Sequence, residues 1–187
     1  MARQYPEIPA HLKRFIEAQP LFFVATAAAD GRVNLWPKGL DSLRILDANR
    51  VLWMNLTGSG NETAAHLHQD PRMTLMFCAF EGEPMILRLY GQARAVHQGD
   101  DDWVALYSNF DPTPGVRQLF DMRVELVQTS CGMGVPFMEY RGQRPNLVDW
   151  ARKKGEEGLR EYWREKNLLS LDGLPTGIES ETERPEP

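Results

Sequence analysis

The sequence contains little cysteine and no long apolar run. Only Cys78 and Cys131 occur in a chain of 187 residues, and their spacing matches neither a disulfide framework nor a metal site. No apolar stretch approaches the ~20 residues that a membrane-spanning helix requires. The opening residues, MARQYPEIPAHLKRF, include no apolar signal-peptide core. We therefore expect a reduced, cytoplasmic protein with no membrane segment.

A surplus of positive charge is also missing. The 21 Lys and Arg residues stand against 26 Asp and Glu residues, which leaves a net charge of −5. This balance argues against nucleic acid or an anionic membrane as a partner of the whole surface. Hydrophobic residues make up 42% of the chain, an ordinary value for a globular protein with a sizeable core. The length suits one domain with appendages.

Short apolar runs separated by turn signals predict an antiparallel β protein. The run 73–80 is apolar on both faces, which is typical of a buried central strand. The long run 85–97 predicts a strand with a bulge at Gly91. The connections are mostly too short for parallel crossovers. The expected strands are residues 21–25, a strand that contains Val33 and Leu35, and residues 42–46, 50–56, 73–80, 85–97 and 122–129.

Few helices accompany these strands, which favours an antiparallel barrel or sandwich over an alternating α/β sheet. Residues 9–18 predict one short helix, a second ends near residue 69, and residues 100–110 predict a third. Residues 147–166 predict a charged amphipathic helix whose middle is weakened by two glycines. The Pro-, Glu- and Thr-rich residues that follow predict a disordered tail.

The stretch TGSGNETAAHL, residues 57–67, joins an expected strand to an expected helix. One interpretation is structural: Ser59 caps the helix and Glu62 completes a capping box. The other is an anion site, because a helix N-terminus binds anions through its free N–H groups. Gly58 and Gly60 would allow close approach of a ligand. The side chains able to donate to phosphate oxygens are those of Thr57, Ser59, Asn61 and Thr63.

Two cations elsewhere favour the anion interpretation. Lys38 ends an expected strand just before Gly39, although an exposed turn lysine is an equally common explanation. Arg88 lies in the otherwise apolar run MILRLYG, and an inward-facing arginine in a barrel strand requires an anionic partner. A lysine, a strand arginine and a helix N-terminus together would suit a phosphate group.

These segments resemble a known family in their order and spacing. RVNLWPKG, LTGSGNETAAHL, MTLMFCAFEGEPMILRLYG and TSCGMGVPFMEY are similar to segments of the pyridoxamine 5′-phosphate oxidase-like proteins. The resemblance covers roughly residues 10–140. It is greater to uncharacterised bacterial members than to the vitamin-making enzyme.

The resemblance implies a six-stranded antiparallel split β-barrel of the FMN-binding type, with peripheral helices. It implies a homodimer with FMN in a groove at the subunit interface. Together with the composition of the C-terminal residues, it predicts three parts of the chain: a barrel domain (1–145), a helical extension (146–172) and a disordered tail (173–187). The residues that it places at the cofactor are Lys38, Gly39, Thr57, Gly58, Ser59, Gly60, Asn61, Thr63, Arg88, Cys131 and Gly132.

This chain also departs from the vitamin-making enzyme. That enzyme carries a Ser-Arg-Lys triplet where this chain has Ser59, Gly60 and Asn61, so two cations of a phosphate site are missing. The C-terminal Arg and His pair that grips pyridoxine phosphate is absent as well. These departures argue against vitamin B6 oxidation and leave a flavin-dependent oxidoreductase of unknown substrate. The same fold elsewhere holds a deazaflavin or haem, or nothing, so a non-catalytic carrier or sensor is the alternative.

Two further groups bear on the cofactor. The turn from Cys131 to Pro136 is either a tight connection or, as the resemblance implies, a backbone loop near the flavin ring of the partner subunit. His66 and His68 lie two residues apart on an expected helix, so they face different ways. We expect both at the surface and predict no metal site.

Overall fold

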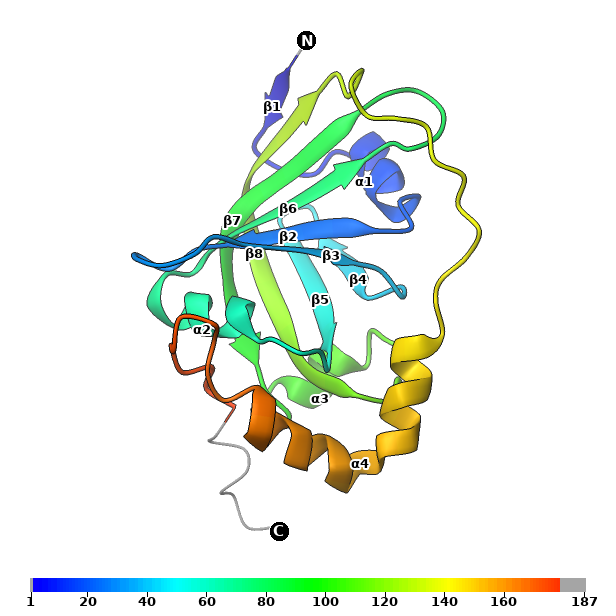
Figure 1. Cartoon of the computed structure of the whole chain (residues 1–187). Helices are drawn as coiled ribbons and strands as arrows, with labels where there is room; N and C mark the ends of the chain where they lie inside the picture. The colour runs from blue at the N-terminus through cyan, green and yellow to red at the C-terminus, as the bar shows by residue number, and fades with distance from the viewer. Residues whose placement is uncertain (1, 179–187) are drawn as a thin grey trace.

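The protein is built on one antiparallel sheet that coils into a barrel. The computed structural model describes residues 2–178, and Figure 1 shows their arrangement. The strands run in the order β3-β2-β6-β7-β8-β5-β4, and β1 pairs with β8. The strands are β1 (Arg3–Tyr5), β2 (Phe22–Thr26), β3 (Asn34–Lys38), β4 (Leu43–Asp47), β5 (Arg50–Leu56), β6 (Arg72–Cys78), β7 (Ile86–Val96) and β8 (Val116–Ser130).

The fold class is confirmed, whereas the strand number is not. The described sheet has eight strands instead of the six that the resemblance implies. Seven of them correspond to strands expected from the sequence, and the eighth is a short N-terminal strand that pairs with the end of β8. Every pairing in it is antiparallel, as the short connections predicted. The register of β7 and β8 shifts between Tyr90 and Gly91, which confirms the predicted bulge.

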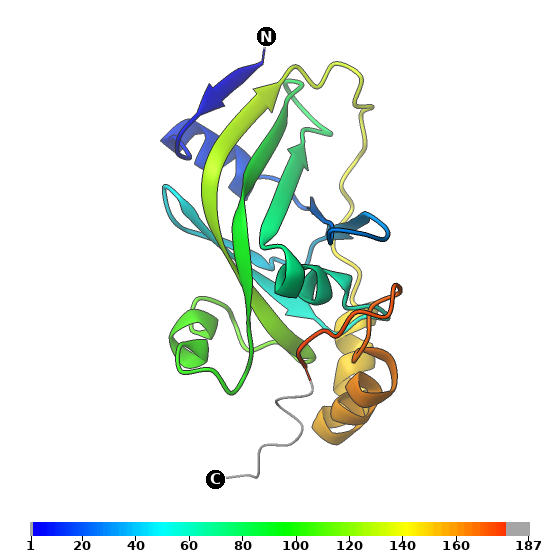
Figure 2. The ribbon, with the colours of Figure 1, turned by 90° about the vertical axis from the view of Figure 1, so that its left-hand side faces the viewer.

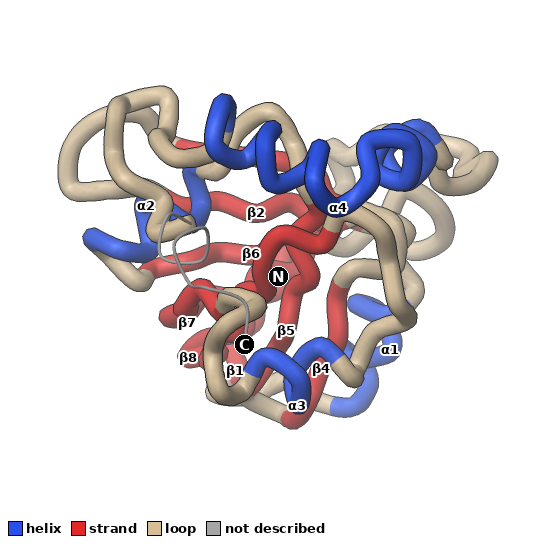
Figure 3. The backbone as a smooth tube through the Cα atoms, turned by 90° about the horizontal axis from the view of Figure 1, so that it is seen from below, coloured by secondary structure: helices blue, strands red, loops and turns tan. Residues whose placement is uncertain are grey.

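Alternating side chains fill the barrel. Phe22, Trp53 and Phe120 form part of one continuous core, in which the rings of Trp53 and Phe120 stack with centroids 4.7 Å apart. Helix α1 (Ala10–Glu17) buries Leu12 and Ile16 in this core. On the other face of β5 and β8, helix α3 (Trp103–Tyr107) builds a second cluster. Helices α2 (Glu62–Gln69), α3 and α4 (Asn146–Lys166) lie on different sides of the sheet (Figure 3).

Two element boundaries differ from the sequence predictions. Helix α3 is shorter than residues 100–110, because the carboxylate of Asp100 accepts a hydrogen bond from the His97 N–H and sets a turn there. Strand β8 begins at Val116 rather than at residue 122. Its first part lacks the alternation of a strand, since Arg117 and Gln118 are both buried beside a register shift. No described helix is long and apolar enough to cross a bilayer.

The chain after the barrel folds back against it. Helix α4 is broken at Gly155, whose φ of 69° lies in the left-handed region that glycine tolerates. We call Asn167–Ile178 the C-terminal segment; it turns back beside α2 (Figure 2). Thr176 and Ile178 are completely buried, so this part of the predicted disordered tail is folded. Residues 179–187 lie outside the described residues, and the division into three parts stays a prediction.

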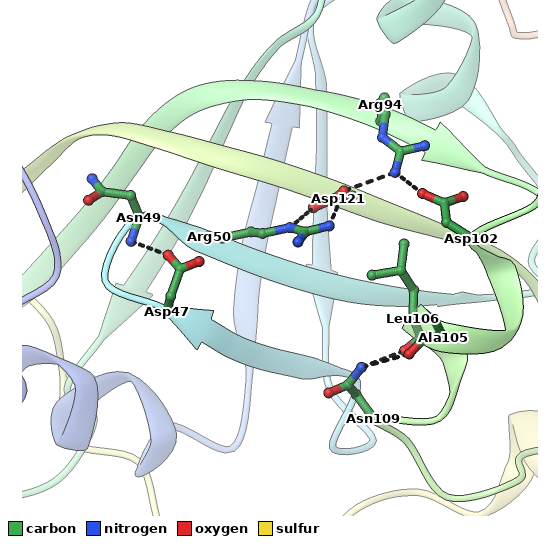
Figure 4. A network of polar contacts seen from close by, with 9 residues as sticks. All are labelled: Asp47, Asn49, Arg50, Arg94, Asp102, Ala105, Leu106, Asn109 and Asp121. Carbon is green, nitrogen blue, oxygen red and sulfur yellow. Dashed lines mark hydrogen bonds and ion pairs between the residues drawn. The ribbon is translucent and has the colours of Figure 1, made fainter.

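An ion-pair network ties α3 to the barrel wall (Figure 4). Asp121 on β8 accepts two hydrogen bonds of 2.8 Å from Arg50 on β5. Arg94 on β7 reaches the same carboxylate at 3.1 Å and also pairs with Asp102, which precedes α3. Burial alone would raise the pKa of Asp121, but the hydrogen bonds and charges of the two arginines outweigh it and lower the pKa.

The Asp121→Ala substitution should lower the free energy of unfolding by about 1–3 kcal/mol, because two charge-assisted contacts are lost. The lowered pKa means that this stabilisation is full above the ordinary Asp pKa of about 3.9 and is lost as the pH falls through the folded-state value. Urea unfolding at pH 7 and in acid measures both effects. Asp149→Ala, which removes the exposed pair with Arg152, is the control and should cost less than about 0.5 kcal/mol. Equal losses in the two variants would contradict the role of the network.

Candidate functional site

Lys38 stands at the end of β3, on the inner face of the barrel. It pairs with Phe22, and Trp36 pairs with Val24, so Lys38 and Trp36 share the face that carries the core. The Lys38 Nζ atom lies 5.0 Å from the Trp36 ring centroid and 5.1 Å from that of Trp53. Burial, followed by the charge of Arg117, lowers the pKa of Lys38 to about 8, and the charge of Glu62 partly opposes them. Two aromatic faces thus hold this cation.

The loop 57–61 is fastened to the C-terminal part of the chain. The buried Thr57 hydroxyl donates to the Gly115 carbonyl at 2.8 Å and accepts from the Trp163 indole at 2.8 Å. The Gly58 carbonyl accepts from the Asn167 side chain at 3.1 Å. The Thr57 hydroxyl therefore serves the fold, in contrast to its predicted role as a phosphate donor. Ser59 is exposed, and the described part of the chain offers its hydroxyl no partner.

The capping-box interpretation of Ser59 is wrong. The N-cap of α2 is Asn61, and its side chain makes no capping bond. Instead its Oδ1 atom accepts from Gln118 on β8 at 2.7 Å. The Glu62 carboxylate folds back over Gly60, where a Cβ atom would overlap it. The helix start is thus fixed by the barrel beneath it rather than by its own residues.

A buried polar cluster places α2 on the barrel. The Asn34 amide on β3 donates to Thr26 and to Thr63, both at 3.1 Å. The predicted site residue Thr63 therefore positions the helix. The Nδ1 atom of His66 lies 3.2 Å from the Thr26 hydroxyl, and His66 is only 1% exposed. The expectation that His66 lies at the surface is therefore wrong, although His68 is exposed.

Arg117 is the functional candidate that the sequence did not predict. It enters the barrel from β8 beneath the loop 57–61 and is 2% exposed. Its Nη2 atom donates to Asn55 at 3.0 Å and to the Gly60 carbonyl at 3.1 Å. Burial lowers its pKa to about 10, while the charge of Glu62 acts in the opposite direction. The predicted last strand, residues 122–129, does not include Arg117. The polar pair Arg117-Gln118 beside apolar residues is the sequence feature that could have indicated a buried cation.

Unpartnered donors test whether this place fits an anion. Arg117 Nε, Arg117 Nη1 and Asn61 Nδ2 are buried without a hydrogen-bond partner in the described structure. Asn34 Oδ1, Gln118 Oε1 and Asn167 Oδ1 are buried acceptors in the same condition. Such groups are costly unless a ligand or water satisfies them. Because the unpartnered Arg117 donors carry positive charge, and Lys38 lies close enough for the charge of Arg117 to lower its pKa, the cluster suits an anion. We call Lys38, Arg117 and the loop 57–61 the candidate phosphate site.

The remaining predicted residues lie elsewhere in the chain. Arg88 pairs with Met76, which pairs with Phe23; successive side chains alternate across a strand, so Arg88 faces away from the inner face of Phe22 and Lys38. Arg88 donates to Ser130 at 3.2 Å, next to the exposed Cys131. One chain therefore presents two separate groups of predicted site residues.

Gly132 and Gly39 occupy tight connections. Gly132 packs against the backbone of Met85, where a Cβ atom would lie 2.7 Å from the Met85 nitrogen. Gly39 follows Lys38, and its carbonyl accepts from the Ser42 hydroxyl at 2.7 Å. Of these two, only Gly39 adjoins the candidate phosphate site.

Fold and site together define a class: a split β-barrel with a cationic, helix-capped site inside one end. The family model for pyridoxamine 5′-phosphate oxidase matches residues 8–131. The pyridoxamine 5′-phosphate oxidase family protein ustO of Aspergillus flavus is 34% identical over 193 residues, covering 91% of this chain and 76% of ustO. The chain therefore belongs to the pyridoxamine 5′-phosphate oxidase family.

Solved structures show the same fold. A variant of HupZ from Group A Streptococcus aligns with a TM-score of 0.54 at 22% identity, covering 66% of this chain and 99% of HupZ. A protein of Lactobacillus delbrueckii, named for the same oxidase, aligns with a TM-score of 0.52 at 15% identity, covering 66% and 94% of the two chains. These likenesses confirm the split-barrel fold.

The Thr57→Val substitution should lower the free energy of unfolding by about 1–3 kcal/mol, because it leaves the Trp163 indole N–H buried without an acceptor. Thr57→Ser keeps the hydroxyl and should lose much less. Urea unfolding of both variants measures the difference. If Thr57→Val were as stable as the wild type, the contact between the loop 57–61 and α4 would not hold the fold together.

Proposed function

We propose that the protein binds FMN, with the flavin phosphate at the candidate phosphate site, and acts as a flavin-dependent oxidoreductase. The observation that carries the proposal is that two cations, Lys38 and Arg117, lie near the N-terminus of α2, where buried donors of Arg117 and Asn61 lack an acceptor. A phosphate group supplies several acceptor oxygens and negative charge at once. Membership of the oxidase family supports the choice of a flavin.

Each part of the site would contribute a different interaction. Lys38 would provide a mobile positive charge on a flexible stem, and Arg117 a fixed charge beneath the loop. The first N–H groups of α2 would add the favourable end of the helix dipole. When bound, the flavin would supply the electron-transfer chemistry, while the protein would contribute binding and orientation.

We also propose a homodimer, which would bring the two groups of predicted residues together. Leu35 is 60% exposed on the outer face of β3. Large apolar side chains also protrude from the connection after β8: Met133, Phe137 and Met138, with Phe137 85% exposed. Clustered apolar exposure of this kind is typical of an interaction surface. A second copy seated there could carry its Cys131 turn and Arg88 toward the cofactor of the first.

The first test is the visible spectrum of the purified protein with FMN after gel filtration. We expect flavin bands that co-elute with protein at the mass of a dimer. Lys38→Met should weaken FMN binding about tenfold or more, since it removes a charge-assisted contact. Lys13→Met, which changes an exposed lysine on α1, is the control.

The other outcomes of that experiment are equally informative. A Soret band would identify haem as the cofactor and contradict the flavin proposal. A protein that ignores FMN and binds a deazaflavin would correct the cofactor but keep the candidate phosphate site. Elution at the mass of a monomer would contradict the dimer. Flavin that is retained but not reduced by NADH or NADPH would favour a carrier over an oxidoreductase using these donors.

Binding of FMN should weaken as the pH rises through about 8, the pKa of Lys38 in the free protein. Below this pH Lys38 is charged and attracts phosphate; above it the neutral amine does not. Affinity can therefore fall by up to about tenfold per pH unit. Titrations between pH 7 and 9 measure the slope. Lys38→Arg stays charged across this range and should remove the slope, so an unchanged slope in that variant would assign it to another group.

A further inference from the structure

Arg117 lacks a counter-ion although it is buried. Its two hydrogen-bond acceptors, the Asn55 side chain and the Gly60 carbonyl, are both neutral. Among the described residues, no carboxylate lies within ion-pair distance of its guanidinium. Burying an uncompensated charge costs several kcal/mol. The buried charge of Arg117 therefore requires an anion nearby, and the residues of the protein compensate this charge only in part.

Glu62 partly compensates the charge of Arg117 in place of a bound anion. Its carboxylate lies against Gly60, the residue whose carbonyl accepts a hydrogen bond from Arg117. This position is at the N-terminus of α2, where a bound anion would also be favoured. The charge of Glu62 raises the pKa of both Lys38 and Arg117. Glu62 thus acts on both cations without pairing with either at close range.

The C-terminal segment holds this carboxylate in place. The backbone N–H of Leu171 donates to Glu62 Oε1 at 3.2 Å. The segment is itself anchored on both sides of Leu171, by Asn167 on the Gly58 carbonyl and by Asp172 on the Arg32 N–H at 2.8 Å. The Leu171 side chain is 74% exposed, so the contact with Glu62 is made by its backbone.

We propose that Arg117 is the second phosphate-binding cation of this site, and that Glu62, held by the C-terminal segment, is an internal anion that the phosphate displaces. The inference rests on the proposed function, since it names the groups that a flavin phosphate meets. On binding, the Glu62 carboxylate moves off Gly60, and the phosphate takes over the compensation of Lys38 and Arg117. The C-terminal segment therefore sets the affinity of a site to which the barrel supplies both cations.

This exchange predicts opposite effects for two variants. Glu62→Gln removes the competing charge, so FMN should bind about tenfold tighter, whereas Arg117→Met should weaken it about tenfold or more. Riboflavin lacks the phosphate, and its affinity should change little in either variant. Inorganic phosphate should compete with FMN more effectively in Glu62→Gln than in the wild type. Fluorescence titration with both flavins measures all of these values.

A second pair of variants tests the C-terminal segment without touching either charge. Leu171→Pro removes the N–H that holds Glu62 and should raise FMN affinity in the same direction as Glu62→Gln. Leu171→Ala keeps the N–H and is the matched control, with unchanged affinity. Leu171 lies outside the barrel core, so these two variants test the inference even if Arg117→Met does not fold.

The outcomes separate this inference from the proposed function. If the wild type binds FMN no more tightly than riboflavin, the candidate phosphate site itself is wrong. If the wild type prefers FMN but Glu62→Gln and Leu171→Pro leave that preference unchanged, only the displacement of Glu62 is overturned. If Glu62→Gln weakens FMN binding, Glu62 supports the ligand instead of competing with it, and the inference is likewise overturned.

Discussion

The burial of positive charge at one end of an apolar barrel is the constraint on which the site depends. Arg117 cannot leave the barrel without breaking its bonds to Asn55 on β5 and to the Gly60 carbonyl. Those two bonds join the strand that enters the loop 57–61 to the loop itself. Lys38 is held against Trp53 of the same strand. The loop is thus shaped by cations that would be unstable there without an anion.

The proposed phosphate site places its positive charge differently from that of the vitamin-making enzyme. The vitamin-making relative carries cations in the loop triplet, where this chain has Ser59, Gly60 and Asn61. Here the second cation comes from β8 beneath the loop. A guanidinium inside the barrel is positioned by its neighbours before any ligand arrives, so less conformational entropy remains to be lost on binding. The same burial makes the free protein depend on an internal substitute, and Glu62 is the carboxylate that acts on both cations.

The C-terminal part of the chain takes part in the site as well as covering it. Trp163 of α4 bonds the Thr57 hydroxyl, and Asn167 bonds the Gly58 carbonyl. The first contact uses a hydroxyl that the sequence offered as a phosphate donor. In the proposed site, the loop would therefore bind its ligand through its backbone N–H groups, together with the cations beneath it. The C-terminal part of the chain, which the sequence presents as an appendage, therefore determines which polar groups of the loop 57–61 are available to a ligand.

Periodicity and turn chemistry in the sequence were sufficient to predict an antiparallel barrel or sandwich, because strands, hairpins and the Gly91 bulge depend on local alternation and on neighbours close in the chain. The choice of the barrel came from the family resemblance. Lys38 and the loop 57–61 were also recognisable, since both stand at the ends of predicted elements. Arg117 was not, because a buried cation breaks the alternation that identifies a strand, and its acceptors lie about sixty residues away on β5 and the loop. The same holds for Thr57, His66 and Glu62, whose roles were decided by partners on α4, β2 and the C-terminal segment. The sequence by itself determined the sheet and the presence of a lysine at a strand end and of a glycine-containing loop that leads into a helix. Only the tertiary structure decided which side chains face the site, because burial and pairing between distant segments are properties of the folded chain.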